Sequence, residues 1–94
     1  MRKIEQDMVN AVWNKSDANF NNTSVHYNEH TYTSLIRLHG NLIATYVHDG
    51  QYKFNANIET FKLWPTRTTS SRLRAMGIVA SIKGGQAAID GVIL

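Results

Sequence analysis

Residues 31–58 read TYTSLIRLHGNLIATYVHDGQYKFNANI, and their pattern is the strongest indication of the fold. Apolar and polar side chains alternate along it, and this period of two is typical of strands with one buried face. Two dipeptides, Gly40-Asn41 and Asp49-Gly50, suit two-residue hairpin loops, which need positive φ angles. The stretch therefore predicts a three-stranded antiparallel meander, and Ser24–Tyr27 is a candidate edge strand before it.

The two loops together set a register for the meander, because a two-residue loop determines which positions face each other. Across the first loop Leu38 faces Ile43, and across the second Val47 faces Tyr52. We expect this register to sort the side chains onto two faces. The predicted core face holds Ile36, Leu38, Ile43, Thr45, Val47, Tyr52, Phe54, Ala56 and Ile58. The predicted solvent face holds Arg37, His39, Ala44, Tyr46, His48, Lys53, Asn55 and Asn57, with Leu35 and Leu42 as apolar exceptions.

Helices and a second hairpin are predicted on either side of the meander. Apolar side chains recur at helical spacing in residues 3–14, which predicts an amphipathic N-terminal helix. A short helix is predicted near 68–76. Residues 78–82 and 87–94 flank Gly84-Gly85 and predict a C-terminal β-hairpin. The expected fold class is α+β, with helices packed on one face of the meander.

Composition limits the class of protein. A chain of 94 residues has room for one core, so we expect a single domain over residues 1–94. The absence of cysteine excludes disulfides, thiol nucleophiles and cysteine-ligated zinc. No apolar run approaches the roughly 18 residues that cross a bilayer, and the start lacks a signal peptide's apolar core. We therefore expect a cytoplasmic protein without a membrane partner, and the net charge of +3 slightly favours anionic partners.

The four histidines are the obvious candidates for metal ligands. His26 and His30 are four residues apart, but the sequence before them is predicted to be extended rather than helical. His39 and His48 flank opposite ends of a strand about 20 Å long, whereas zinc needs ligands about 2 Å from the ion. The sequence therefore predicts no metal site and no cofactor.

Catalytic groups are equally sparse. Glu5 and Asp7 are expected on the solvated face of the first helix, and Asp49 is expected in a turn. No pair of carboxylates is placed for acid–base chemistry, and Gly84-Gly85 lacks the remainder of a phosphate-binding loop. We therefore predict that the protein is not an enzyme and has no catalytic residues.

Two groups of side chains are candidates for binding another molecule. The solvent face of the meander mixes charged, histidine and tyrosine side chains, as protein interfaces do. Its predicted partner-binding residues are Arg37, His39, Tyr46, His48 and Lys53. The alternative is nucleic acid, bound by arginines of the second helix together with the basic face of the sheet. The residues of this alternative are Arg67, Arg72 and Arg74. The open edge of the final hairpin is compatible with either a monomer or a homodimer.

Several segments of the chain resemble a group of small tailed-bacteriophage proteins. Residues 38–44, LHGNLIA, match an LHGN-x-I-A hairpin pattern. Residues 64–77, WPTRTTSSRLRAMG, match the pattern W-x-T-x-T-T-x-S-R-L-x-A-L-G, with Met76 in the place of a leucine. The opening residues 2–5 and the pair Asn22-Thr23 are similar too, so the likeness covers most of the chain.

The resemblance implies a phage or prophage protein that acts in a bacterial cytoplasm. It brings no assigned activity and no catalytic residues. Small non-catalytic phage proteins commonly bind and block a host machine, such as RNA polymerase, a nuclease or a CRISPR complex. We therefore predict a protein that binds and inhibits or modulates a host or defence protein. The alternative is a nucleic-acid-binding phage accessory protein.

Overall fold

The computed structural model describes residues 2–94, which form helices and two antiparallel sheets. In chain order the elements are α1 (Lys3–Trp13), β1 (Ala18–Phe20), β2 (Thr23–Asn28), β3 (Thr33–Leu38), β4 (Asn41–Val47), β5 (Phe54–Ala56), α2 (Ile58–Leu63), α3 (Arg67–Ala75), β6 (Ala80–Lys83), β7 (Gln86–Ile89) and β8 (Val92–Ile93). The predicted α+β class, N-terminal helix and short second helix are confirmed.

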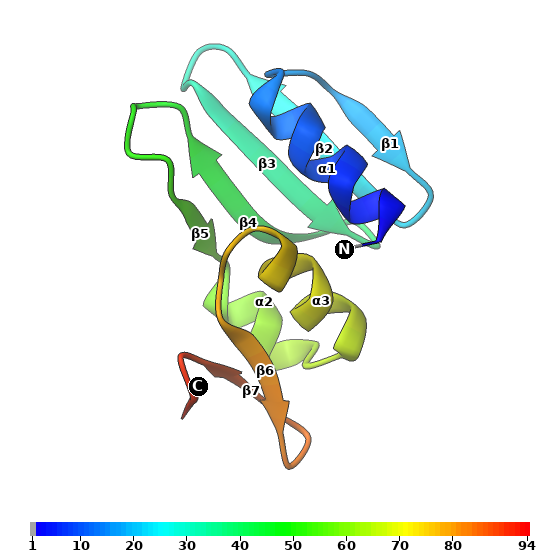
Figure 1. The fold of residues 1–94 in the computed structure, drawn as a ribbon, viewed down its shortest axis with the longest axis vertical. Coiled ribbons are helices and arrows are strands. Elements are labelled where there is room, and N and C mark those ends of the chain that lie inside the picture. The colour runs from blue at the N-terminus through cyan, green and yellow to red at the C-terminus, as the bar shows by residue number, and fades with distance from the viewer. Residues whose placement is uncertain (1) are drawn as a thin grey trace.

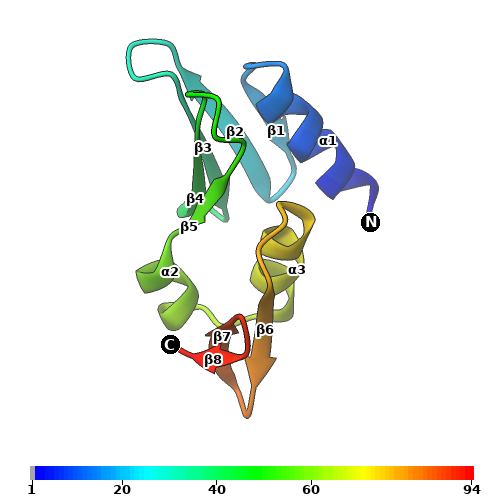
Figure 2. The same ribbon diagram turned by 60° about the vertical axis from the view of Figure 1, so that its left-hand side comes forward.

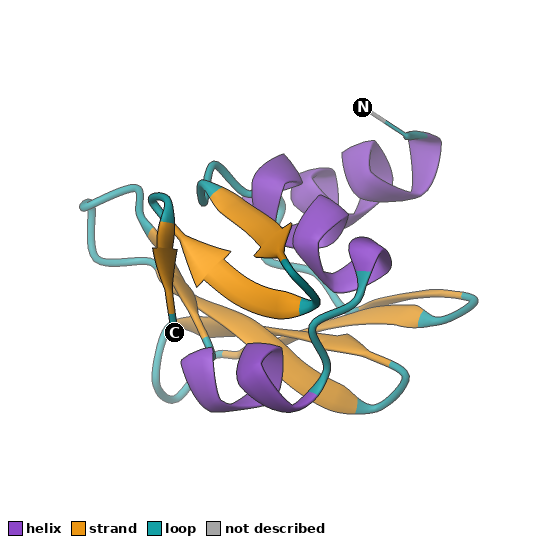
Figure 3. Cartoon of the chain, turned by 90° about the horizontal axis from the view of Figure 1, so that it is seen from below, coloured by secondary structure: helices purple, strands orange, loops and turns teal. Residues whose placement is uncertain are grey.

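The larger sheet is a meander whose five strands lie in chain order, β1-β2-β3-β4-β5. Helix α1 lies across one face of it, as Figures 1 and 2 show, and the view from below separates this helix from the strands (Figure 3). The helix inserts Met8 and Val12, which are fully buried, toward Val25 and Ile36 of the sheet. The amphipathic pattern of residues 3–14 therefore has the role of closing the core.

The first hairpin loop lies one residue earlier than predicted. Its two residues are His39 and Gly40, with φ of +52° and +81°, so Leu38 faces Asn41. Two positive φ angles are the signature of the type I′ loop, whose twist matches that of the strands. Glycine at the second position meets this requirement without strain.

A β-bulge then changes the register between β3 and β4. Arg37 faces Leu42 while Ile36 faces Ala44, so Ile43 is the extra residue. A bulge of this kind turns the following side chains to the opposite faces. The predicted sorting of β4 is therefore wrong: Ala44 and Tyr46 face the core, whereas Thr45 and Val47 face outward.

The connection between β4 and β5 is longer than the predicted two-residue loop. It runs over residues 48–53, and Asp49 Oδ1 accepts a hydrogen bond from the Gln51 amide at 3.1 Å. Aspartate side chains stabilise loops by accepting hydrogen bonds from backbone amides that have no partner strand. Tyr52 and Ile58, both predicted on the core face, are consequently exposed, while Phe54 is buried as expected.

The remainder of the chain packs beyond the lower end of the larger sheet, as Figures 1 and 2 show. Helix α2, which was not predicted, starts where the Asn57 side chain accepts a hydrogen bond from the Thr60 amide. Thr66 caps α3 in the same way through the Thr69 amide. The hairpin around Gly84-Gly85 is confirmed, and an additional strand, β8, extends it into a three-stranded sheet. Within residues 2–94 no helix combines the length and the hydrophobicity that a membrane crossing requires.

A buried polar network holds α1, α3 and β2 together. Arg72 donates to Glu5 Oε2 at 2.8 Å through Nη1 and to Thr23 Oγ1 at 3.1 Å through Nε. Ser71 donates to the same carboxylate oxygen at 2.6 Å. Burial raises the pKa of Glu5, but the hydrogen bonds from Ser71 and Arg72 outweigh it and the pKa lies below its ordinary value. The prediction that Glu5 lies on a solvated helix face is therefore wrong.

Candidate functional site

The partner-binding surface predicted from the sequence is not assembled in the structure, because its central residue is buried. Tyr46 is only 2% exposed and its ring packs against those of Trp13 and Phe54, at centroid distances of 5.1 and 4.7 Å. Burial raises the pKa of its hydroxyl. The bulge after β3 is the physical reason for this correction, since it turns Tyr46 toward α1.

His48 is also drawn into the body of the protein. Its Nε2 lies 2.9 Å from Ser34 Oγ, and its ring centroid lies 4.7 Å from that of Tyr46. Burial, with a smaller contribution from the charge of Lys15, lowers the pKa of His48. A half-buried, hydrogen-bonded imidazole of this kind is a packing element rather than a free contact residue.

The other predicted contact residues lie in separate places. Arg37 is half-buried on the sheet face that α1 leaves uncovered, whereas His39 is exposed in the first hairpin loop. Lys53 is exposed in the loop just before β5, at the opposite end of the sheet. These three side chains therefore do not form one patch with each other.

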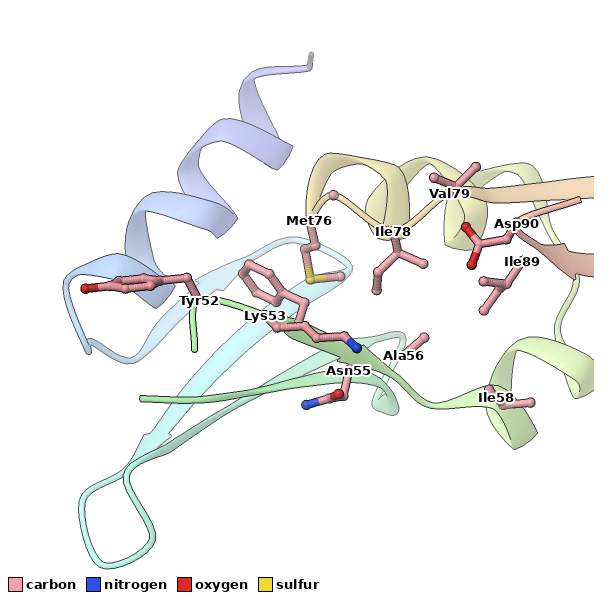
Figure 4. Close-up of a pocket in the computed structure, with 12 residues that line it drawn as sticks. Tyr52, Lys53, Asn55, Ala56, Ile58, Met76, Ile78, Val79, Ile89 and Asp90 are labelled. Atoms are coloured by element: carbon pink, nitrogen blue, oxygen red, sulfur yellow. The ribbon is translucent and has the colours of Figure 1, made fainter. Parts of the chain in front are cut away.

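The structure offers instead a groove between β5 and the connection from α3 to β6. Its volume is about 490 Å³, and Figure 4 shows the residues around it. The groove is lined by Tyr52, Lys53, Phe54, Asn55, Ala56, Ile58, Met76, Gly77, Ile78, Val79, Ile89 and Asp90. We call it the edge-strand groove, because β5 is the last strand of the larger sheet and forms one wall.

The backbone of β5 presents unused hydrogen-bonding groups to this groove. The Asn57 amide donates to the Ile43 carbonyl at 2.8 Å, which makes 43 and 57 a hydrogen-bonded pair of the ladder. Because such pairs alternate along antiparallel strands, Asn55 also bonds to β4, whereas the amides and carbonyls of Phe54 and Ala56 point away from it. An edge of this kind accepts a further strand.

Apolar side chains form the opposite wall and the rims. Figure 4 shows Met76 and Ile78 directed from the α3–β6 connection toward β5. At the rims Tyr52 is 78% exposed and Val79 is 62% exposed. The groove thus combines main-chain donors and acceptors with apolar contact area. This combination suits an extended peptide better than a small polar ligand.

Apart from Lys53, which was predicted as a partner-binding residue, the groove residues were not identified as a site from the sequence, because they belong to three distant parts of the chain. The segment around Met76 and Ile78 indicates the end of a helix and the start of a hairpin, and nothing in it indicates that β5 is its neighbour. One local signal was available. β5 contains only two apolar residues, Phe54 and Ala56, and each is followed by an asparagine. A strand this short is typical of a sheet edge.

Arg72, one of the three arginines predicted to bind nucleic acid, is not accessible to such a partner. Its side chain is 3% exposed and bound to Glu5, so it cannot reach a phosphate. Arg67 and Arg74 are exposed and meet Arg2 around a second groove of about 390 Å³. The other lining residues of this groove are Ser70, Ser71, Ser81 and Ile82.

A third depression lies where the two longest phage-like segments meet. The hairpin residues Leu38, His39, Asn41 and Ile43 face Thr60, Trp64, Thr66, Thr68 and Thr69 across a pocket of about 340 Å³. Four further residues of the phage-like segments, Glu5, Asn22, Thr23 and Arg72, meet in the buried polar network. Segments that carry the resemblance are thus brought together at two places in the fold, this pocket and the buried network. Among residues 2–94, no three His, Asp or Glu side chains lie close enough together to hold a metal ion.

Comparison with known proteins identifies one family. The model of the Kyanoviridae Gp96 protein family matches residues 1–90, which is nearly the whole chain. No curated protein and no solved structure matches it. The predicted resemblance to phage proteins is confirmed, and the chain belongs to the Kyanoviridae Gp96 family of phage proteins.

Proposed function

We propose that this phage protein works by binding, without catalysis, an extended segment of a bacterial host or defence protein in the edge-strand groove, and that it inhibits or modulates that protein. The observation that carries the proposal is the outward backbone of Phe54 and Ala56 at the wall of an apolar groove. Strand addition to such an edge gives affinity through main-chain hydrogen bonds, and the neighbouring pockets select side chains.

The composition of the groove supports a protein partner rather than nucleic acid. Its walls are mostly apolar, and its two charged lining residues, Lys53 and Asp90, have opposite signs. A polyanion would gain little from this balance, whereas a peptide backbone is neutral. Exposed tyrosine and aliphatic side chains at the rim match the anchors of protein interfaces.

The test of the proposal is a proline at the outward position of the edge strand. Ala56→Pro removes the amide that points into the groove but leaves the ladder to β4, because proline is tolerated at edge positions whose amide faces away. Leu63→Lys is a matched control, since Leu63 is 73% exposed but lies outside the groove. We expect the wild type and Leu63→Lys to retain the same host protein from a lysate, and Ala56→Pro to lose it.

Hydrogen exchange on the purified complex gives the decisive readout. We expect the amides of Phe54 and Ala56 to become protected only when the retained protein is present, and the activity of that protein to fall when the complex forms. If Ala56→Pro does not fold, Val79→Lys provides a second block at the exposed rim. Equal retention by all variants, or no added protection along β5, would show that the groove is not the binding site.

A further inference from the structure

A second feature, independent of the edge-strand groove, is the basic groove formed by Arg2, Arg67 and Arg74. We propose that this groove binds the phosphate backbone of nucleic acid without reading its sequence. Arg2 precedes α1, Arg67 and Arg74 belong to α3, and Ser81 and Ile82 of β6 complete the lining. Arg2 is far in the chain from the two arginines of α3, so its convergence with them is a property of the fold.

The three arginines of this groove have no carboxylate partners. Within residues 2–94 the ion pairs shorter than 4.0 Å join Lys3 to Asp7, His26 to Asp17 and Arg72 to Glu5, and none involves Arg2, Arg67 or Arg74. Glu5 lines a neighbouring depression together with Arg74, but its carboxylate accepts hydrogen bonds from Ser71, from Arg72 and from the Arg2 amide. The three arginines therefore carry positive charge without an ion-pair partner among residues 2–94, and this charge complements an anionic partner.

Arg74 is held in position for such a partner. Its Nη1 donates to Ser70 Oγ at 2.7 Å and to the Ala80 carbonyl at 3.1 Å. A guanidinium has five N–H donors, so several remain available while the group stays fixed. Fixed guanidinium groups lose little entropy when they bind phosphate oxygens.

The dimensions and the lining favour a polymer over a single phosphate group. Arg67 and Arg74 are seven residues apart on α3, which separates their positions by about 10 Å along the helix axis. This separation is larger than one phosphate group, so the two arginines would contact different phosphates of a chain. No aromatic side chain lines the groove, and bases would therefore find no stacking surface. Recognition would be limited to the backbone.

The experiment measures how strongly salt weakens binding to a labelled DNA duplex and to a single strand of the same length. Binding through three arginines predicts a slope of log affinity against log salt of about −2.7 for the duplex. We expect Arg67→Gln and Arg2→Gln each to reduce the steepness of that slope by about 0.9. Lys62→Gln removes the same charge from an exposed site outside the groove and should leave the slope unchanged.

Several outcomes would overturn the inference. They are no binding at about 50 mM salt, an equal loss with Lys62→Gln, tighter binding of a phosphoserine peptide than of either nucleic acid, and a preference for one base sequence. Circular dichroism of each variant checks that the fold is kept. Because Ala56→Pro leaves the basic groove intact, it should bind DNA like the wild type, so failure of one proposal is distinguishable from failure of the other.

Discussion

Helix α3 carries three arginines that the fold treats in two different ways. Arg72 points inward, is almost fully buried and donates hydrogen bonds to Glu5 and Thr23. Arg67 and Arg74 point outward into the basic groove and have no carboxylate partner among residues 2–94. The same side chain is thus a structural tie on one face of a nine-residue helix and a candidate ligand-binding group on the other.

The difference follows from the angular positions on the helix. Each residue advances about 100° around the axis, so Arg74 lies within about 20° of Arg67, whereas Arg72 lies about 140° away. Arg72 shares its face with Thr69 and Leu73, which are buried. A charge on that face is tolerated only when a partner and further hydrogen bonds compensate for its desolvation. Hence the inner arginine requires Glu5, and the outer ones do not.

Breaking the inner pair should have the largest effect. We expect Arg72→Met to lower the free energy of unfolding by about 3–5 kcal/mol, because it leaves the Glu5 carboxylate buried without its main partner. Chemical denaturation followed by circular dichroism measures this change. The double variant Glu5→Leu, Arg72→Met should recover much of the loss, since it removes both charges. A double variant no more stable than the single one would show that the desolvated carboxylate is not the cause.

Acid should also lower the free energy of unfolding through this network, by less than Arg72→Met does. The pKa of Glu5 is lower in the folded state than its ordinary value of 4.5, so the unfolded chain binds the proton more readily. The stabilisation is therefore complete above about pH 4.5 and is lost as the pH falls through the folded-state pKa. We expect denaturation midpoints to drop over this range in the wild type.

Glu5→Gln is the control for the acid effect, because it cannot titrate. Its stability should depend less on pH below 4.5 than that of the wild type. The loss in acid should stay below that of Arg72→Met, since the contacts of Arg72 with Thr23 and Asn22 survive protonation of the carboxyl group. Identical pH profiles for the two proteins would contradict the role of this residue.

The helical positions of these arginines could be predicted from the sequence, but their partners could not. The spacing of Arg67 and Arg74 puts both on the polar side of α3, opposite Leu73. The partner of Arg72 is Glu5, which lies 67 residues earlier in the chain. No local pattern indicates a contact over such a separation. Grouping all three arginines as one binding set was therefore wrong for the residue whose environment is purely tertiary.

In the larger sheet, too, the element was predictable from the sequence but its detailed packing was not. Alternation in residues 31–58 correctly predicted the meander and the burial of Ile36, Leu38 and Phe54. The bulge at Ile43 could not be predicted from the alternation. Its neighbours Leu42 and Ala44 are also apolar, so the sequence fits the core with or without the extra residue. That one residue turned Tyr46 inward and removed the predicted interface. The edge-strand groove depends on how the α3–β6 connection and the end of β7 lie beside β5, which alternation cannot indicate.

Substitution of Arg74 should have an effect on stability between those of Arg72 and Arg67. Its guanidinium contacts Ser70 and the Ala80 carbonyl but is exposed on its other side. We expect Arg74→Met to cost about 1 kcal/mol, because hydrogen bonds of a partly solvated group contribute modestly. The loss should appear in the denaturation midpoint with an unchanged slope against denaturant. A loss as large as that of Arg72→Met would mean that the outer face of α3 also carries the fold.

Substitution of Arg67 should have the smallest effect on stability. Its side chain is exposed and makes no hydrogen bond or ion pair with the rest of residues 2–94. We expect Arg67→Gln to change the free energy of unfolding by less than about 0.5 kcal/mol. The same variant should nonetheless reduce the salt dependence of DNA binding, so the two measurements on one protein separate folding from recognition. If stability falls by several kcal/mol instead, Arg67 belongs with Arg72, and the division of α3 into a structural and a binding face is wrong.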